Sequence, residues 1–103
     1  MHRVNLKMER LVYQWIEAEL FNARKKFPSS DHAVLALCEE SGELARAVLN
    51  HKYGKCGLEE VKNEAVQVAV MAIRVIMEGD STVNLPASVY IDDGVSDDAL
   101  VPN

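Results

Sequence analysis

The chain has 103 residues and a formal net charge of −5, with 49% apolar and 26% charged residues. This composition is that of a single globular domain of modest size. Its 11 Lys and Arg residues form no dense block, which argues against binding of a nucleic-acid polymer, because displacing counterions from a phosphate backbone requires a basic surface. Free nucleotides remain candidate ligands, since a metal ion and a few cations can hold them.

The two cysteines and the hydropathy pattern indicate the compartment. Cys38 falls in a helical pattern and Cys56 in an expected loop, so they form neither a disulfide framework nor a zinc-ligand spacing. The sequence contains no signal peptide and no apolar run long enough to cross a bilayer. We therefore expect a cytoplasmic protein that does not bind membranes.

The first expected element is a helix from about Asn5 to Lys26. The segment from Phe27 to Asp31 breaks it, because Pro28 disfavours helical geometry in the residue before it. Ser30 or Asp31 can then cap a new helix. The apolar stripe of the first helix consists of Met8, Leu11, Val12, Trp15 and Ala18.

Two further helices are predicted, from about His32 to Asn50 and from Leu58 to Glu78. The segment 51–57 between them holds two glycines and several basic or His residues, which is typical of a turn. Gly79 ends the third helix. The sequence therefore predicts an all-α fold, a bundle of antiparallel helices joined by short connections.

The third helix has an apolar sector around Val61 that is expected to face the core. It carries a second apolar strip on the opposite side. A helix that is apolar nearly all round requires cover on both sides. In so short a chain the simplest cover is a second copy, so we expect an obligate homo-oligomer, a dimer or a tetramer. This strip consists of Val66, Val70, Ile73 and Met77.

The composition changes at Asp80, after which the chain holds two prolines and four aspartates between Asp92 and Asp98. We predict a helical domain over residues 1–79 and an irregular acidic tail over residues 80–103. A short strand is expected near Val89 to Ile91.

Two polar pairs, Glu40 with Glu43 and Glu64 with Gln67, occupy the same two angular positions on the helical wheels of the second and third helices. With Leu37 and Val61 as the zero points of the two helices, Glu40 and Glu64 both fall at roughly −60°, beside the apolar sectors. Glu43 and Gln67 both fall at roughly −120°. A buried carboxylate without a partner loses solvation or takes up a proton, and like charges three residues apart repel each other. A divalent cation shared between the helices would relieve both penalties.

Oxygen ligands of this kind suit Mg²⁺, which is commonly bound through a few carboxylates together with waters and substrate phosphates. A further acid beside the cluster, Glu39 or Glu60, could accept a proton from an attacking water. On the helical wheel Glu39 points to roughly −160°, away from the core centre. Its simplest alternative role is that of a solvated surface residue.

The stretch 32–45, with Glu39-Glu40-x-x-Glu43-Leu-Ala, and the later stretch 59–69 resemble the MazG-like all-α nucleotide pyrophosphohydrolases. Their pattern is EExxE on one helix and ExxD on the next, and the resemblance covers about residues 15–78. It implies Mg²⁺-dependent hydrolysis, with Mn²⁺ as a possible substitute, of a nucleoside triphosphate to monophosphate and pyrophosphate in an oligomeric bundle. By position, the implied metal ligands are Glu40, Glu43, Glu64 and Gln67, the last standing where the family usually has aspartate.

Candidate substrate contacts are spread over the chain. Lys52 and Lys55 in the loop could reach a polyphosphate, and Arg74 lies on the Gln67 side of its helix. Trp15 could stack on a base, and His32 could read its edge. Each has a structural alternative: the lysines as solubilising loop residues, Trp15 as a core or interface aromatic, and His32 as a residue of a helix start.

Two alternatives to this function stay open at the level of sequence. One is a phosphoribosyl-ATP pyrophosphohydrolase-type activity on a similar helical scaffold. The other is a catalytically weakened or inactive helical module that serves oligomerisation or partner binding. Gln67 bears on the second, because an amide oxygen carries no negative charge and should hold a dication less tightly than a carboxylate.

Overall fold

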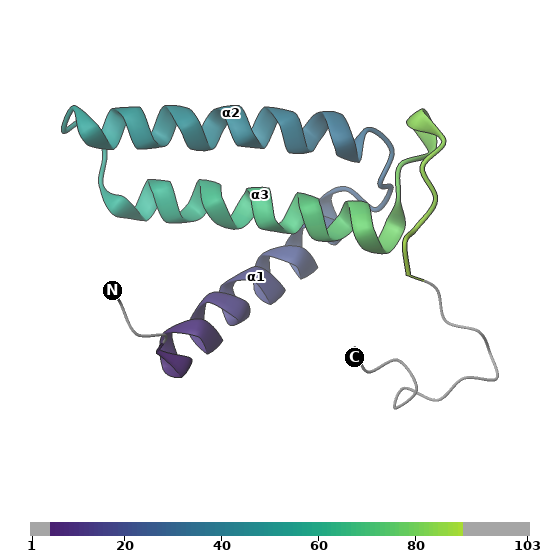
Figure 1. Ribbon diagram of the computed structural model, residues 1–103, viewed down its shortest axis with the longest axis horizontal. Helices are drawn as coiled ribbons and strands as arrows, with labels where there is room; N and C mark the ends of the chain where they lie inside the picture. The colour runs from purple at the N-terminus through teal and green to yellow at the C-terminus, as the bar shows by residue number, and fades with distance from the viewer. Residues whose placement is uncertain (1–4, 90–103) are drawn as a thin grey trace.

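The computed structural model describes residues 5–89, and this part of the chain is all-helical. It contains α1 (Leu6–Lys26), α2 (Ala33–Lys52), α3 (Leu58–Glu78) and the short 3₁₀ helix η1 (Ser81–Val83). No strand occurs within these residues, which confirms the predicted all-α class. Helices α2 and α3 form an antiparallel hairpin, and α1 packs obliquely against α3 (Figure 1).

The helix ends follow local chemistry at most positions. The Asn5 side chain caps α1 by accepting hydrogen bonds from the backbone N–H groups of Lys7 and Met8 at 3.0 and 3.2 Å. The observed ends of α3 coincide with the predicted ones, while α2 continues two residues beyond the predicted Asn50. Gly79 ends α3 with a φ of 71°, and a Cβ there would lie 2.3 Å from the Leu85 carbonyl oxygen.

The start of α2 differs from the prediction, because neither Ser30 nor Asp31 caps it. His32 occupies the N-cap position with a left-handed φ of 65° and provides no side-chain cap. Instead, the carboxylate of Asp80 accepts hydrogen bonds from the backbone N–H groups of His32 at 3.1 Å and Val34 at 3.0 Å. The cap is therefore supplied by the segment that follows α3, and it links the start of α2 to the end of α3.

Residues 80–88, expected to open an irregular tail, pack back on the helices. Asp80 pairs with Leu85 in an isolated β-bridge, and the Ser88 N–H donates to the Ile76 carbonyl at 2.8 Å. The predicted strand near Val89 to Ile91 extends past the described residues, and the aspartates of residues 92–98 lie outside them. The ordered part of this segment was missed because its contacts are with residues distant in sequence.

The interior of the described chain is thin. Its buried apolar side chains are Ala23, Ala33, Ala47 and Val70, of which only Val70 is completely buried. On α2 the buried line runs through Ala33, Glu40 and Ala47, which are seven residues apart and so lie on one face. The sequence predicts the core sector of α2 around Leu37, with Val34, Ser41, Leu44 and Val48. This sector is shifted from the observed line, and Val48 is 49% exposed. Small alanines on the buried line allow α2 and α3 to approach closely.

The apolar strips of α3 and α1 differ in how far the chain itself covers them. Val70, in the strip of α3 assigned to a second copy, is completely buried within the chain, while Met77 of the same strip is half exposed. In contrast, the apolar stripe of α1 is largely uncovered, with Met8 64%, Leu11 45% and Val12 41% exposed. The open apolar surface therefore lies on α1 more than on α3.

Candidate functional site

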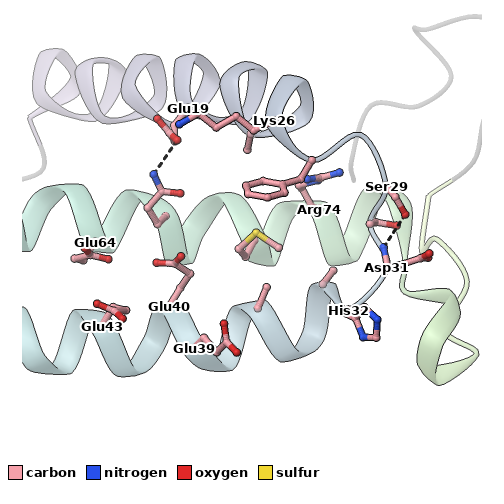
Figure 2. A pocket seen from close by; sticks show the side chains of 17 residues that line it. Glu19, Lys26, Ser29, Asp31, His32, Glu39, Glu40, Glu43, Glu64 and Arg74 are labelled. Atoms are coloured by element: carbon pink, nitrogen blue, oxygen red, sulfur yellow. Dashed lines mark hydrogen bonds between the residues drawn. The ribbon is translucent and has the colours of Figure 1, made fainter.

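A cavity of about 620 Å³ lies where α1, the loop before α2 and the α2–α3 hairpin meet (Figure 2). One end is acidic, and the other carries hydroxyls, a histidine, an aspartate and the Arg74 guanidinium. The acidic end is lined by Glu19, Glu39, Glu40, Glu43 and Glu64, together with Gln67, and the Lys26 side chain of α1 extends toward Glu19 (Figure 2). The opposite end is lined by Ser29, Ser30, Asp31, His32 and Arg74.

Glu40 is the central group of the acidic end. It lies half-buried on the inward line of α2, between two buried alanines, and faces α3. Burial raises the pKa of its carboxyl, and the charge of Glu64 and a hydrogen bond to Glu64 raise this pKa further. The charges of Glu43 and Glu39 act in the same direction. The hairpin thus holds Glu40 in a place where, without a cation, its charged form is disfavoured.

Gln67 lies on α3 one turn after Glu64 and lines the same cavity. Its amide Nε2 donates a 2.8 Å hydrogen bond to Oε1 of Glu19 on α1 (Figure 2). The amide therefore links α3 to α1 at the edge of the acidic end. This contact gives Gln67 a defined orientation that the sequence pattern alone did not specify.

Arg74 forms the floor of the opposite end. Its side chain is almost fully buried, and its guanidinium donates to both carboxylate oxygens of Glu78, at 3.0 and 2.9 Å. Arg24 of α1 donates to the same carboxylate at 3.3 Å. Hydrogen bonding from Arg74 is the main cause that lowers the pKa of Glu78. A bidentate pair of this kind fixes the guanidinium plane beside the cavity.

The acidic end of the cavity offers oxygen ligands of the kind that Mg²⁺ prefers. Within residues 5–89, no group of three His, Cys, Asp or Glu side chains is already assembled closely enough to hold a metal ion. Glu40 and Glu64 nevertheless adjoin each other, and Glu43 lies within electrostatic reach. Because Mg²⁺ usually keeps several waters and takes one or two carboxylates plus substrate phosphates, this pair suits it in chemical type. Glu43 and the amide oxygen of Gln67 are available in the same cavity.

The structure places the remaining predicted residues in different surroundings. Glu39 lines the cavity at an exposed position. Glu60 lies outside the cavity lining, and its neighbour is Cys56, whose thiol pKa is raised first by burial and then by the Glu60 charge. Between the two candidate helpers, Glu39 is therefore the one adjacent to the acidic end. His32 and Arg74 both line the cavity, as described above.

Three predicted substrate contacts lie away from the main cavity. Lys52 and Lys55 are exposed at the far end of the hairpin, and Lys52 stacks over the Tyr53 ring, 5.6 Å from its centroid. Lys52 is nine residues beyond Glu43, which is about 13 Å along a helix. Trp15 lines a second cleft, of about 460 Å³, between α1 and α3, where the Lys62 ammonium lies 4.6 Å from its ring centroid.

Sequence reasoning missed the contribution of α1. Glu19, Ala23 and Lys26 of this helix all line the main cavity. Their spacing of four and three residues places them on one helical face, and this was the available signal. The apolar stripe chosen instead lies on a neighbouring face, so α1 was not expected to bring charged groups to the site.

None of the helices within residues 5–89 combines the length and the apolar character needed to cross a bilayer. A scan against protein-family models, a search of curated proteins and a search of solved structures each found no match to this chain.

Proposed function

We propose that the protein is a Mg²⁺-dependent nucleoside triphosphate pyrophosphohydrolase that converts a triphosphate and water to a monophosphate and pyrophosphate. The observation that supports this proposal best is the single cavity whose lining gathers Glu40, Glu43 and Glu64 together with the cations Lys26 and Arg74. An acidic end suits a metal-bound polyphosphate, and the opposite end offers donors for the rest of a nucleotide. The resemblance of the EExxE stretch to the MazG-like family points to the same chemistry.

The cavity residues would hold the metal ion, accept a proton and contact the substrate. Glu40 and Glu64 would hold the ion, and Glu43 and Gln67 would complete or orient its shell. When bound, Mg²⁺ would neutralise charge on the phosphate oxygens. Glu39, at the exposed rim, would accept a proton from the water that attacks the phosphorus. The hydroxyls and His32 at the opposite end would contact the sugar or base.

The test is release of pyrophosphate from a panel of canonical and modified triphosphates, with phosphoribosyl-ATP included, in the presence of Mg²⁺ or Mn²⁺. We expect turnover of at least one substrate and a loss of about 100-fold or more in kcat/KM for Glu40→Gln, because removal of a metal-holding carboxylate should exceed the effect of removing an outer group. Glu60→Gln is the matched control and should retain activity, since Glu60 does not line the cavity.

A second function, a non-catalytic helical module, is favoured by one observation. The acidic groups are not assembled into a ready metal cluster within residues 5–89. This alternative predicts no turnover of any member of the panel and no effect of either ion on the melting temperature. Such a result would overturn the hydrolase proposal.

Self-association forms part of the proposal. The described chain buries few apolar side chains completely, whereas the stripe on α1 is open. A small domain with so thin an interior needs additional cover to reach ordinary stability. We propose a second copy of the same chain as that cover.

A further inference from the structure

The amide of Gln67 has two chemically different ends, and its neighbour selects between them. The Glu19 carboxylate, when ionised, only accepts hydrogen bonds, so it engages the NH₂ group of Gln67 and not the carbonyl oxygen. The observed contact is of this kind, with Nε2 of Gln67 2.8 Å from Oε1 of Glu19. Because the amide is planar, its Oε1 is then turned away from Glu19.

The acidic groups Glu40 and Glu64 reach the cavity from different helices than Glu19 does. Glu19 reaches the cavity from α1, whereas Glu40 and Glu64 belong to the hairpin, and Figure 2 shows Glu19 and Glu40 on opposite sides of the α3 helix axis. Gln67 lines the same cavity as Glu40 and Glu64 and contacts Glu19. With its NH₂ group engaged by Glu19, its carbonyl oxygen is the amide atom left to serve as a ligand.

We propose that Glu19 is a positioning residue that holds the Gln67 carbonyl oxygen toward a dication at Glu40 and Glu64. This inference rests on the proposed function. It also gives a physical reason for an amide at position 67: a carboxylate there would lie at hydrogen-bond distance from the carboxylate of Glu19, and like charges repel. The negative charge that an acid on α3 would bring is instead carried by α1.

The proposal differs from a purely structural role for the same hydrogen bond. A simple clamp between α1 and α3 would contribute to the melting temperature of the metal-free protein and leave metal affinity unchanged. A positioning role affects the affinity for the ion, because groups that orient metal ligands typically change affinity by about 10-fold to 100-fold.

The experiment measures Mn²⁺ binding to the full chain by electron paramagnetic resonance of the free ion, with no nucleotide present. We expect Glu19→Ala to weaken Mn²⁺ binding about tenfold. Glu17→Gln is the control, since Glu17 is exposed on α1 and outside both cavities, and it should bind Mn²⁺ like the unaltered protein. The melting temperature of each metal-free variant is recorded in parallel.

An exchange variant provides the rescue. In Glu19→Gln/Gln67→Glu, the amide at position 19 donates to the carboxylate at position 67, so the hydrogen bond is restored in the opposite direction. We expect this protein to bind Mn²⁺ at least as tightly as the unaltered one. If Glu19→Ala lowers only the melting temperature, or if the exchange variant binds as weakly as Glu19→Ala, the positioning role is wrong while the proposed function stands. If the unaltered protein binds no Mn²⁺ and hydrolyses no triphosphate, the proposed function fails and the inference fails with it.

Discussion

At the scale of a residue, Glu40 links the stability of the protein to its proposed chemistry. Its pKa is raised above the ordinary value of 4.5, first by burial and then by Glu64. The folded protein therefore binds more protons than the unfolded chain near and above that pH, and its stability declines as the pH rises through the raised pKa. At neutral pH the charged Glu40 destabilises the metal-free fold.

A prediction follows for Glu40→Gln in the absence of metal. At pH 7 this variant should melt a few degrees above the unaltered protein, because it removes a partly buried charge beside two other carboxylates. The difference should shrink as the pH falls through the raised pKa of Glu40 and should be gone below 4.5, where Glu40 is protonated in both the folded and the unfolded chain. Mg²⁺ should raise the melting temperature of the unaltered protein but not that of the variant. Thermal melts by circular dichroism, with and without Mg²⁺, measure all three effects, and a variant that melts lower at pH 7 would contradict the argument.

At the scale of an element, the start of α2 depends on a residue that follows α3. Asp80 is buried and accepts backbone hydrogen bonds from His32 and Val34. Hydrogen bonds from Thr82 and from the backbone of Val34 lower its pKa from the ordinary 3.8 to about 2. The stability that Asp80 contributes is thus fully present above pH 3.8 and is lost as the pH falls toward 2.

We expect Asp80→Asn to lower the melting temperature at pH 7 on the order of 5 °C, as loss of a helix cap does in a domain of this size. The gap between the variant and the unaltered protein should close near pH 2. Asp31→Asn is the matched control and should change stability little, because within residues 5–89 the Asp31 carboxylate accepts a hydrogen bond only from the exposed Ser81 hydroxyl. Glu78 also titrates below its ordinary range, so the difference between proteins is the relevant quantity. A gap that is the same at pH 7 and pH 2 would show that ionisation of Asp80 is not the cause.

The three helices and the cavity residues on α2 and α3 were predictable from local sequence patterns. Helix periodicity, Pro28 and Gly79 are local signals, and they gave the three helices and both ends of α3. The spacing of Glu40, Glu43, Glu64 and Gln67 was sufficient to place them along one cavity, since all four positions depend only on helical geometry and an antiparallel hairpin.

The contributions of Asp80 and Glu19 were not predictable in this way. The cap from Asp80 joins residues 48 apart in the chain, and Glu19 meets Gln67 across the same separation. Such contacts depend on the angle at which α1 crosses α3 and on the path of the chain after Gly79. No local pattern encodes either of them. Lys52 and Lys55 lie away from the main cavity, because α2 continues through Lys52 and places both at the far end of the hairpin.

At the scale of the whole molecule, the uncovered stripe on α1 should decide the oligomeric state. Met8, Leu11 and Val12 are each more than 40% exposed, and among the helices of residues 5–89, α1 packs only on α3. Burial of such side chains is the main favourable term in association, and a symmetric pairing of two copies would bury the stripe on both.

We expect sedimentation equilibrium to give two or four times the 11.5 kDa mass of one chain. Leu11→Glu should shift this mass toward a single chain and lower the melting temperature, because one apolar contact per copy is replaced by a charge. Gln14→Glu adds the same charge at an exposed position of α1 outside the stripe and should leave the assembly intact. An unaltered protein that sediments as one chain at micromolar concentration, and melts at a temperature independent of its concentration, would show that α1 remains uncovered in solution.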